Sequence, residues 1–312
     1  MELLDHFPPR HPQSVTATAA EWRAHWPQIA ATGLAPFDLA VRAGLTADRL
    51  AWAFGGGYQA AIRELQPERV LGSDTASLCA TEATGNRPRD IQSTLSTLPD
   101  GRLQLNGAKR WSTMSPVATH LFVLVRDARD ATEGDAFDRP TLKLLRVSAN
   151  APGVSITPMP TTPFTPELPH AELRLTQVAI APEDVLPGDG WSELVKPFRT
   201  LEDIYVSAAC LAFIVRVALA EAWPRTIAED SLNALSALHT LAHQPPAAAA
   251  THLALAGTLR AISHIHSAID AHTAQHPQHA ASLAWQRDRK LFGIAGATRD
   301  VRTQRAWERV AG

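Results

Sequence analysis

The spacing of apolar residues changes twice along the 312 residues of this chain. Between residues 16 and 66 apolar side chains recur every three or four positions, as Trp22 and Trp26 do, which predicts two or three helices. Residues 78–187 instead form short apolar runs, some of them alternating, with turn residues between them, which predicts strands. Helical spacing returns after residue 190. The pattern therefore predicts an α+β protein.

These changes of period divide the chain into three predicted domains: a helical segment at 1–76, a β-domain at 77–189 and a helical bundle at 190–312. In the bundle, Pro224 ends the first helical run, because proline has no N–H for the helical hydrogen bonds. The other helices of the bundle are expected at about 227–242, 247–273 and 280–310.

Glycines and prolines modify this picture at three places. Gly55, Gly56 and Gly57 lie inside a helical run with no strand before them and no Lys-Ser/Thr after them, so they predict a break or close helix packing rather than a phosphate loop. Asn106-Gly107 predicts a turn between two strands. The prolines within 158–169 predict an irregular loop at a sheet edge.

Charge and composition exclude some classes of partner. The chain has 29 Lys and Arg against 31 Asp and Glu, so nucleic acid is not expected to bind. The longest apolar stretch, 207–222, contains Arg216 and is shorter than the ~20 residues of a membrane span, so no spanning helix is expected. Cys79 and Cys210 lack the spacing of a metal or redox motif, and the start lacks a secretory pattern, which predicts a cytoplasmic protein.

Two segments carry a resemblance to a known family. The first contains SLCATEATGNRPRDI and LPDGRLQLNGAKRWSTMSPVATHLFVLVRD, between residues 77 and 127, and the second is LRLTQVAIAPEDVLPGDGW at 173–191. They resemble the central domain of acyl-CoA dehydrogenases, flavoenzymes that place a double bond in acyl thioesters, in a shortened and divergent form. The resemblance implies an N-terminal helical domain, a middle antiparallel β-barrel-like domain and a C-terminal helical bundle, with FAD as cofactor.

The flavin ring needs an apolar or aromatic wall and a few hydrogen-bond donors. Matched onto the family pattern, Leu78, Ala80 and Thr81 line the ring from one strand, and Trp111 and Thr113 line it from another. Taken one by one, Trp111 is equally a core aromatic, and the two threonines are equally ordinary strand residues. Their order in a chain with this domain sequence favours the flavin site.

The positions that face the cofactor phosphates differ from the family. GNRPRD at 85–90 replaces the family's Gly-Ser-Asp, and Arg87 or Arg89 is then either a phosphate ligand or a solvated loop residue. The chain also lacks the family's Arg-x-x-Phe-Gly segment and Gln-x-x-Gly-Gly-x-Gly loop, which hold the adenosine diphosphate half of FAD.

The family's catalytic base is also replaced. Residues 287–310 resemble the last helix pair of the family. Arg287 and Asp288 match the start of this pair, and Thr298 matches a cofactor-side threonine. Gly296 stands where the family has the glutamate that removes the substrate α-proton. Glycine cannot accept a proton.

Some family members carry the base in a Leu-Glu-Arg segment of the first bundle helix, which matches Leu201-Glu202-Asp203 here. Glu202 is therefore the candidate base, provided that burial raises its pKa toward neutrality. The alternative is a glutamate that suits the start of a helix. Asp203 replaces the family's arginine.

The 13 histidines offer a different chemistry. His239 and His243 are four residues apart on a predicted helix, but no glutamate lies between them as in zinc proteases, so no metal is expected. We expect these two, and the five others that follow, to be surface histidines: His264, His266, His272, His276 and His279.

Three functions remain open. The first is a FAD-dependent oxidoreductase that dehydrogenates the acyl group of acyl-CoA or of an acyl-carrier thioester, and the family likeness implies an electron-transfer flavoprotein as acceptor. The second is a catalytically lapsed relative that works as one subunit of a heteromeric enzyme. The third is a flavin-free scaffold, because a fold alone does not define a function. A homodimer or tetramer is expected, because the bundle is rich in Ala and Leu.

Overall fold

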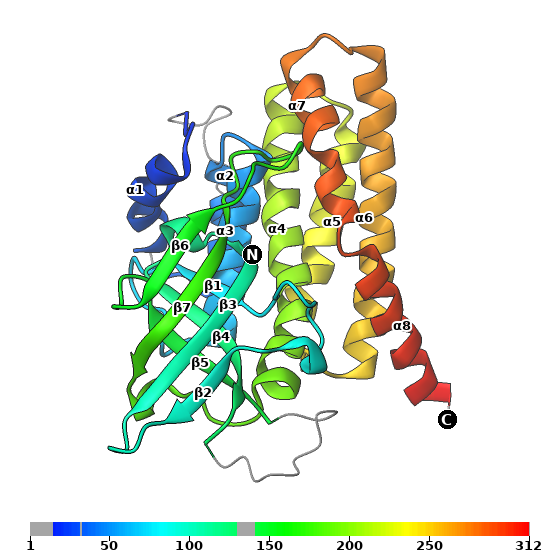
Figure 1. The fold of residues 1–312 in the computed structure, drawn as a ribbon. Helices are drawn as coiled ribbons and strands as arrows, with labels where there is room; N and C mark the ends of the chain where they lie inside the picture. Colours follow the sequence, from blue (N-terminus) through cyan, green and yellow to red (C-terminus); the bar gives the residue numbers. More distant parts are fainter. Residues whose placement is uncertain (1–14, 32, 130–140, 312) are drawn as a thin grey trace. The chain divides into compact units, whose positions relative to one another are not determined.

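The structure is a computed structural model that describes residues 15–31, 33–129 and 141–311. It divides into two compact units, which we describe separately (Figure 1). We call the first the helical unit: it comprises Met1–Glu64, Thr162–Glu167 and Arg199–Gly312. The second is the sheet unit, which comprises Leu65–Thr161 and Leu168–Phe198. The helical segments before and after the strands thus belong to one compact body.

Where the structure describes the N-terminal part, from residue 15 onward, it shows three helices, within the predicted two or three: α1 (Ala19–Ala30), α2 (Pro36–Thr46) and α3 (Leu50–Leu65). Helix α1 begins at a capping box, in which the Thr18 hydroxyl accepts a hydrogen bond from the Glu21 N–H and the Glu21 carboxylate accepts one from the Thr18 N–H. The Trp22 ring stacks with the rings of Trp26 and Trp52, with centroids 5.1 and 6.1 Å away. The three tryptophans join α1 to α3.

The glycines of α3 are packing positions. A Cβ added at Gly56 would lie 2.3 Å from the Cβ of Ala43, and one at Gly57 would lie 2.7 Å from the carbonyl oxygen of Tyr205. Both distances are far below van der Waals contact. The prediction of close helix packing is confirmed, and α3 continues through the glycines without a break.

Five helices follow the sheet: α4 (Lys196–Ala220), α5 (Arg225–Ala242), α6 (Ala249–Gln275), α7 (Ala280–Asp288) and α8 (Gly296–Ala311). Figure 1 shows α5 and α6 side by side. The single helix expected at 280–310 is wrong, because a 3-10 turn at Arg289–Gly293 separates α7 from α8. At this point the Asp288 carboxylate accepts hydrogen bonds from Arg287 and from the Thr165 N–H.

Helix α4 with the π-helical turn before it, Gly190–Ala220, is long and apolar enough by length and composition to cross a membrane. This corrects the expectation that no stretch reaches that length. However, 67% of its most apolar window is buried inside the protein, which is the behaviour of a core helix.

The described residues of the sheet unit form one seven-stranded sheet: β1 (Ala76–Cys79), β2 (Thr94–Thr97), β3 (Leu103–Thr113), β4 (His120–Asp127), β5 (Leu142–Ser148), β6 (Val154–Pro158) and β7 (His170–Ile180). The strand order is β1-β4-β2-β3-β7-β6, and β5 pairs with β4. The pairs of β4 with β1 and with β2 are parallel, so the sheet is mixed rather than wholly antiparallel as expected. A buried apolar cluster that includes Leu105, Leu121 and Leu173 forms its core.

The turn expected at Asn106-Gly107 is wrong, because β3 runs through both residues. The pairing of β3 with β7 shifts register beside Gly107, whose φ is 154°, and the Asn106 side chain accepts a hydrogen bond from the Gln177 N–H. A Cβ at Gly107 would lie 2.2 Å from the hydroxyl oxygen of Ser93. The glycine therefore permits a bulge and a close approach rather than a hairpin.

The proline-rich segment between β6 and β7 is an irregular loop, as predicted, and β6 lies at one end of the strand order. Its tip, Thr162–Glu167, belongs to the helical unit. Glu167 forms ion pairs with Arg49 at 2.9 Å and with Arg287 at 3.2 Å, and the Thr165 N–H donates to Asp288 at 2.7 Å. Ion pairs and a buried hydrogen bond thus fasten the tip to the helices.

We predict opposite effects for alanine at two helical glycines. Gly57→Ala should lower the free energy of unfolding by about 1–3 kcal/mol, because the new Cβ overlaps the backbone of Tyr205 and Val206. Gly257→Ala in α6 should raise it by about 0.5–1 kcal/mol, because the nearest atom lies 3.8 Å away and alanine favours a helix. Urea unfolding of both variants checks this. Equal effects would contradict the packing described for α3.

Candidate active site

The end of β1 lies against the end of β3 in the sheet unit. The Thr81 carbonyl accepts a hydrogen bond from the Arg110 N–H at 2.8 Å, and the Ser77 hydroxyl donates to the Thr113 carbonyl at 2.7 Å. The structure thus brings Thr81, Trp111 and Thr113 to one place in the sheet. The Thr81 hydroxyl makes no hydrogen bond with the described residues.

The other two residues expected to line the flavin ring lie on the same short strand and its exit. Leu78, in β1, is half-buried, and Ala80, directly after β1, is 8% exposed.

Trp111 is presented by a strained backbone. Its φ is 56°, in the left-handed region that a bulky residue seldom adopts, and the pairing of β3 with β7 shifts register between Lys109 and Ser112. The side chain is 49% exposed. A core aromatic has neither property, so packing alone does not explain this tryptophan. Strain of this kind is concentrated at functional sites.

His170, the first residue of β7, is a site residue that the sequence analysis missed. Its Nδ1 lies 3.2 Å from the Thr113 hydroxyl, and its ring meets the Trp111 ring edge-on with centroids 5.7 Å apart. Burial lowers the pKa of His170. The signal that finds it is the cross-strand register of Thr113 with His170, which the sequence does not display.

Glu82, next to Thr81, is part of a buried ion pair. Its Oε1 accepts from the Lys109 ammonium at 2.6 Å and from the Ser93 hydroxyl at 2.8 Å, and its Oε2 accepts from the Gln92 N–H at 2.7 Å. Burial acts to raise the pKa of Glu82, but Lys109 and the backbone N–H donors outweigh it and hold the pKa below its usual value. Glu82 is therefore a carboxylate fixed inside the sheet.

The loop after β1 carries Arg87 and Arg89 on the surface. The Asp90 carboxylate stabilises this loop by accepting a hydrogen bond from the backbone N–H of Arg87 at 3.0 Å. Arg87 is exposed, and the Arg89 side chain is 65% exposed with its Nε 3.8 Å from Asp90. Both arginines face solvent.

Glu202 and Thr298 belong to the helical unit, whereas the ring-lining residues and Arg87 belong to the sheet unit. Thr298 is exposed on α8. Glu202 is half-buried on α4, and burial raises its pKa to about 7, with a further contribution from Asp203 and opposite effects from Arg199 and Arg299. The condition placed on a candidate base, a pKa near neutrality, is therefore met.

The neighbour of Glu202 explains why its carboxylate is unpaired. Asp203 binds two arginines of α8: Arg299 lies 2.7 Å from its Oδ1 and Arg302 lies 2.6 Å from its Oδ2. Glu202 makes no hydrogen bond or ion pair with the described residues. Asp203, which occupies the position of the family's arginine, thus pairs with arginines itself.

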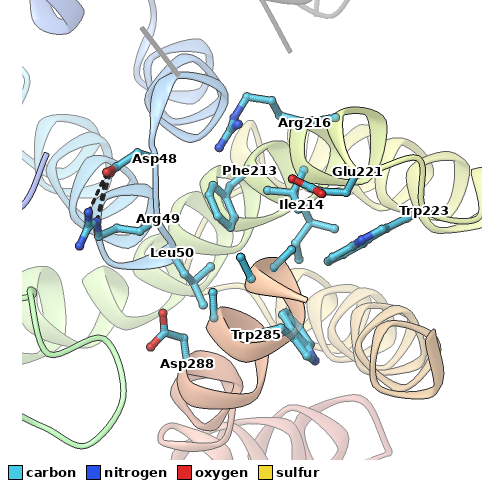
Figure 2. Close-up of a pocket in the computed structure, with 15 residues that line it drawn as sticks. Asp48, Arg49, Leu50, Phe213, Ile214, Arg216, Glu221, Trp223, Trp285 and Asp288 are labelled. Atoms are coloured by element: carbon cyan, nitrogen blue, oxygen red, sulfur yellow. Dashed lines mark hydrogen bonds and ion pairs between the residues drawn. The ribbon is translucent and has the colours of Figure 1, made fainter. Parts of the chain in front are cut away.

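A cavity of about 270 Å³ lies elsewhere in the helical unit, between the start of α3, the C-terminal half of α4 and α7 (Figure 2). Arg216 lines it, with its guanidinium 5.2 Å from the Phe213 ring centre and 2.5 Å from the Ala47 carbonyl, the C-cap of α2. Three acids line the cavity, and each has a partner: Asp48 pairs with Arg49, Asp288 pairs with Arg287, and the Glu221 carboxylate lies 3.5 Å from Nε2 of His279. These contacts are those of a helix cap and of structural ion pairs.

The described residues contain no group of three His, Cys, Asp or Glu placed to hold a metal. The rings of His239 and His243 contact each other at 4.8 Å. His266 corrects the expectation of surface histidines, because its ring packs against both Trp285 and Phe292, and burial lowers its pKa to about 4.

Comparison with known proteins agrees with the architecture. Residues 76–178 match the family model described as acyl-CoA dehydrogenase, middle domain. This segment is thus similar to the middle domain of acyl-CoA dehydrogenases. No curated protein matches the chain by sequence.

Solved structures match along almost the whole chain. Butyryl-CoA dehydrogenase from Megasphaera elsdenii is 14% identical with a TM-score of 0.62, over 96% of this chain and 99% of that one. The prolyl acyl carrier protein oxidase AnaB is 13% identical with a TM-score of 0.63, over 95% and 91%. The FAD complex of PigA is 13% identical with a TM-score of 0.63, over 94% and 90%. The chain therefore has the acyl-CoA dehydrogenase fold, and the resemblance found in the sequence is confirmed.

The buried pair predicts a large loss of stability on Lys109→Met. The substitution leaves Glu82 buried without its cation, so the free energy of unfolding should fall by about 3–5 kcal/mol. Arg102→Met is the control, because its pair with Asp100 is exposed and solvent screening leaves such a pair little effect on stability. Urea unfolding checks both variants. Similar losses would contradict the role given to Lys109.

The raised pKa of Glu202 predicts that Glu202→Gln stabilises the protein by an amount that depends on pH. The folded-state pKa of about 7 lies above the ordinary 4.5, so the contribution to stability from protonated Glu202 is complete below about pH 4.5 and is lost as pH rises through 7. The free energy of unfolding of Glu202→Gln relative to the parent should therefore rise from pH 5 to pH 8. The exposed Glu229→Gln should show no such rise. If the difference in free energy of unfolding between Glu202→Gln and the parent does not change with pH, the pKa of Glu202 is not raised.

Proposed function

We propose that this chain is a flavin-dependent oxidoreductase of the acyl-CoA dehydrogenase type that removes hydrogen from the α and β carbons of an acyl thioester. The observation that carries the proposal is Trp111, which a strained bulge holds half-exposed beside Thr81 and Thr113 within a segment similar to the acyl-CoA dehydrogenase middle domain. An exposed indole and two hydroxyls are the wall and the donors that a flavin ring needs.

The residues fit the ring portion of FAD better than its phosphates. Leu78, Ala80, Thr81, Trp111 and Thr113 would hold the ring, and bound FAD would supply the acceptor for the substrate hydride. For the phosphates, Arg87 is the exposed cation beside the ring-lining strand, and Thr298 is the matching residue on α8. Because the chain lacks both adenosine-diphosphate loops of the family, we expect weak FAD binding.

Glu202 is the proposed base. Its carboxylate would take the substrate α-proton, and a pKa of about 7 leaves a large part of it ionised at neutral pH while keeping it basic. Gly296, at the family position of the base, has no side chain to do this.

The proposed substrate is an acyl thioester of coenzyme A or of a carrier protein. Two structural neighbours are named for such compounds, one as a butyryl-CoA dehydrogenase and the other as a prolyl acyl carrier protein oxidase. An electron-transfer flavoprotein is the proposed acceptor, by family likeness.

A homo-oligomer is supported by exposed apolar side chains near the C-terminus, where Ile294, Val301, Trp307 and Val310 are 51–64% exposed.

A second candidate is a subunit of a heteromeric enzyme whose partner chain supplies the base and the phosphate contacts. Gly296 and the two missing loops favour it. Turnover by the purified chain distinguishes the two candidates.

The proposal predicts different defects for two substitutions. Glu202→Gln should leave the Kd for FAD unchanged but lower acyl-CoA turnover about 10²- to 10⁴-fold, because an amide cannot accept the proton. Trp111→Ala should weaken FAD binding, with loss of turnover as a consequence. Glu229→Gln, at an exposed glutamate, is the control for the first substitution, and Leu71→Ala, which removes an exposed apolar side chain of the sheet unit, is the control for the second.

Absorbance titration with FAD and reduction of a dye acceptor measure these effects. A parent that binds FAD but dehydrogenates no acyl thioester would favour the heteromeric subunit. If the parent binds no FAD, the flavin-free scaffold is the remaining function.

A further inference from the structure

His170 contacts both the hydroxyl and the indole that we assign to the flavin ring. Its Nδ1 lies 3.2 Å from the Thr113 hydroxyl, and its ring lies edge-on to Trp111 at 5.7 Å, with 70° between the planes. Thr113 and His170 are direct cross-strand partners. One imidazole is thus placed to set the orientation of two side chains on the neighbouring strand.

The segment that His170 contacts requires support. Trp111 and Met114 both have left-handed backbones, with φ of 56° and 62°, and Thr113 lies between them. Each such residue costs on the order of 1–2 kcal/mol and persists only where its surroundings hold it. The Met114 N–H donates to the carbonyl of Pro169 at 2.8 Å. Pro169 and His170 therefore hold this segment through the backbone and the side chain together.

The tautomer of the imidazole also determines whether the Thr113 hydroxyl can donate a hydrogen bond to a ligand. Burial lowers the pKa of His170, so the ring is neutral at pH 7 and carries one N–H. If Nδ1 accepts, the Thr113 hydroxyl donates its proton to His170. If Nδ1 carries the proton, the hydroxyl accepts from His170 and its own proton is free for a ligand.

We infer that His170 is a positioning residue for the proposed flavin site. Its Nδ1–H donates to the Thr113 hydroxyl, which leaves that hydroxyl as a donor to the bound flavin ring. The edge of the imidazole ring fixes the plane of Trp111. The inference rests on the proposed function. It follows from the chemistry of the site, because a flavin ring gains negative charge on reduction and donors stabilise that charge.

Four variants separate the hydrogen bond from the ring contact. His170→Asn places an amide where Nδ1 was and keeps the bond without the ring. His170→Phe keeps the ring without the bond, and His170→Gln, which places its amide where Nε2 was, is a second variant without the bond. Thr113→Val removes the hydroxyl at the other end. Circular dichroism and thermal melting show which variants are folded.

The first measurement is FAD affinity. His170→Phe, His170→Gln and Thr113→Val should each raise the Kd for FAD about 2- to 10-fold, the equivalent of one hydrogen bond. The double variant His170→Phe/Thr113→Val should bind no more weakly than the worse single variant, because both remove the same interaction. His170→Asn should stay within about threefold of the parent.

The second measurement needs no flavin. Nitrogen-15 NMR of His170 in the FAD-free protein should show protonated Nδ1 in the parent and a shift away from that tautomer in Thr113→Val.

Each contrary result has a definite meaning. Additive losses in the double variant, or a parent imidazole protonated on Nε2, overturn the inference while the proposed function stands. A parent that binds no FAD overturns the proposed function and this inference with it.

Discussion

The buried ion pair of Glu82 with Lys109 is the contact on which the candidate flavin site depends. Glu82 directly follows Thr81, and Lys109 lies two residues before Trp111, so the pair joins the two strand ends that present these side chains. A buried pair offsets its desolvation only when the remaining hydrogen bonds are also made. Ser93 and the Gln92 N–H supply them here. The strained backbone at Trp111 is thus anchored to a rigid part of the sheet.

A second arrangement of charges, in the helical unit, accounts for the properties of Glu202. Asp203 pairs with Arg299 and Arg302 of α8, and Glu202 is left half-buried without a partner. Burial and the charge of Asp203 then both favour its protonated form, which is why its pKa rises to about 7. Two adjacent acids on one helix therefore differ: Asp203 is held in ion pairs, and Glu202 has a raised pKa.

The sequence predicted those features that depend on local periodicity. The change from helical to alternating spacing and back placed the sheet between two helical segments. Of the two alternatives for the glycines of α3, a break or close packing, the structure shows close packing. Features decided by distant residues were not predictable. Asn106-Gly107 is typical of a turn, but Ser93 and Gln177 turn it into a bulge within β3.

The same limit applies to the site. Thr81, Trp111 and Thr113 were predicted because the family motif contains them, and hydrogen bonds join the two chain segments that carry them. His170 was missed, since it is 57 residues from Thr113 and only the strand register joins them. The break between α7 and α8 was missed for a similar reason, because a tertiary hydrogen bond from Thr165 engages Asp288 where α7 ends.

The most direct test of this account is a crystal structure of the protein grown with millimolar FAD. The account predicts electron density for the flavin ring against the indole of Trp111, with the Thr113 hydroxyl in hydrogen-bond contact with it. FAD bound away from Trp111, or a well-ordered Trp111 with no flavin density beside it at that concentration, would contradict the account.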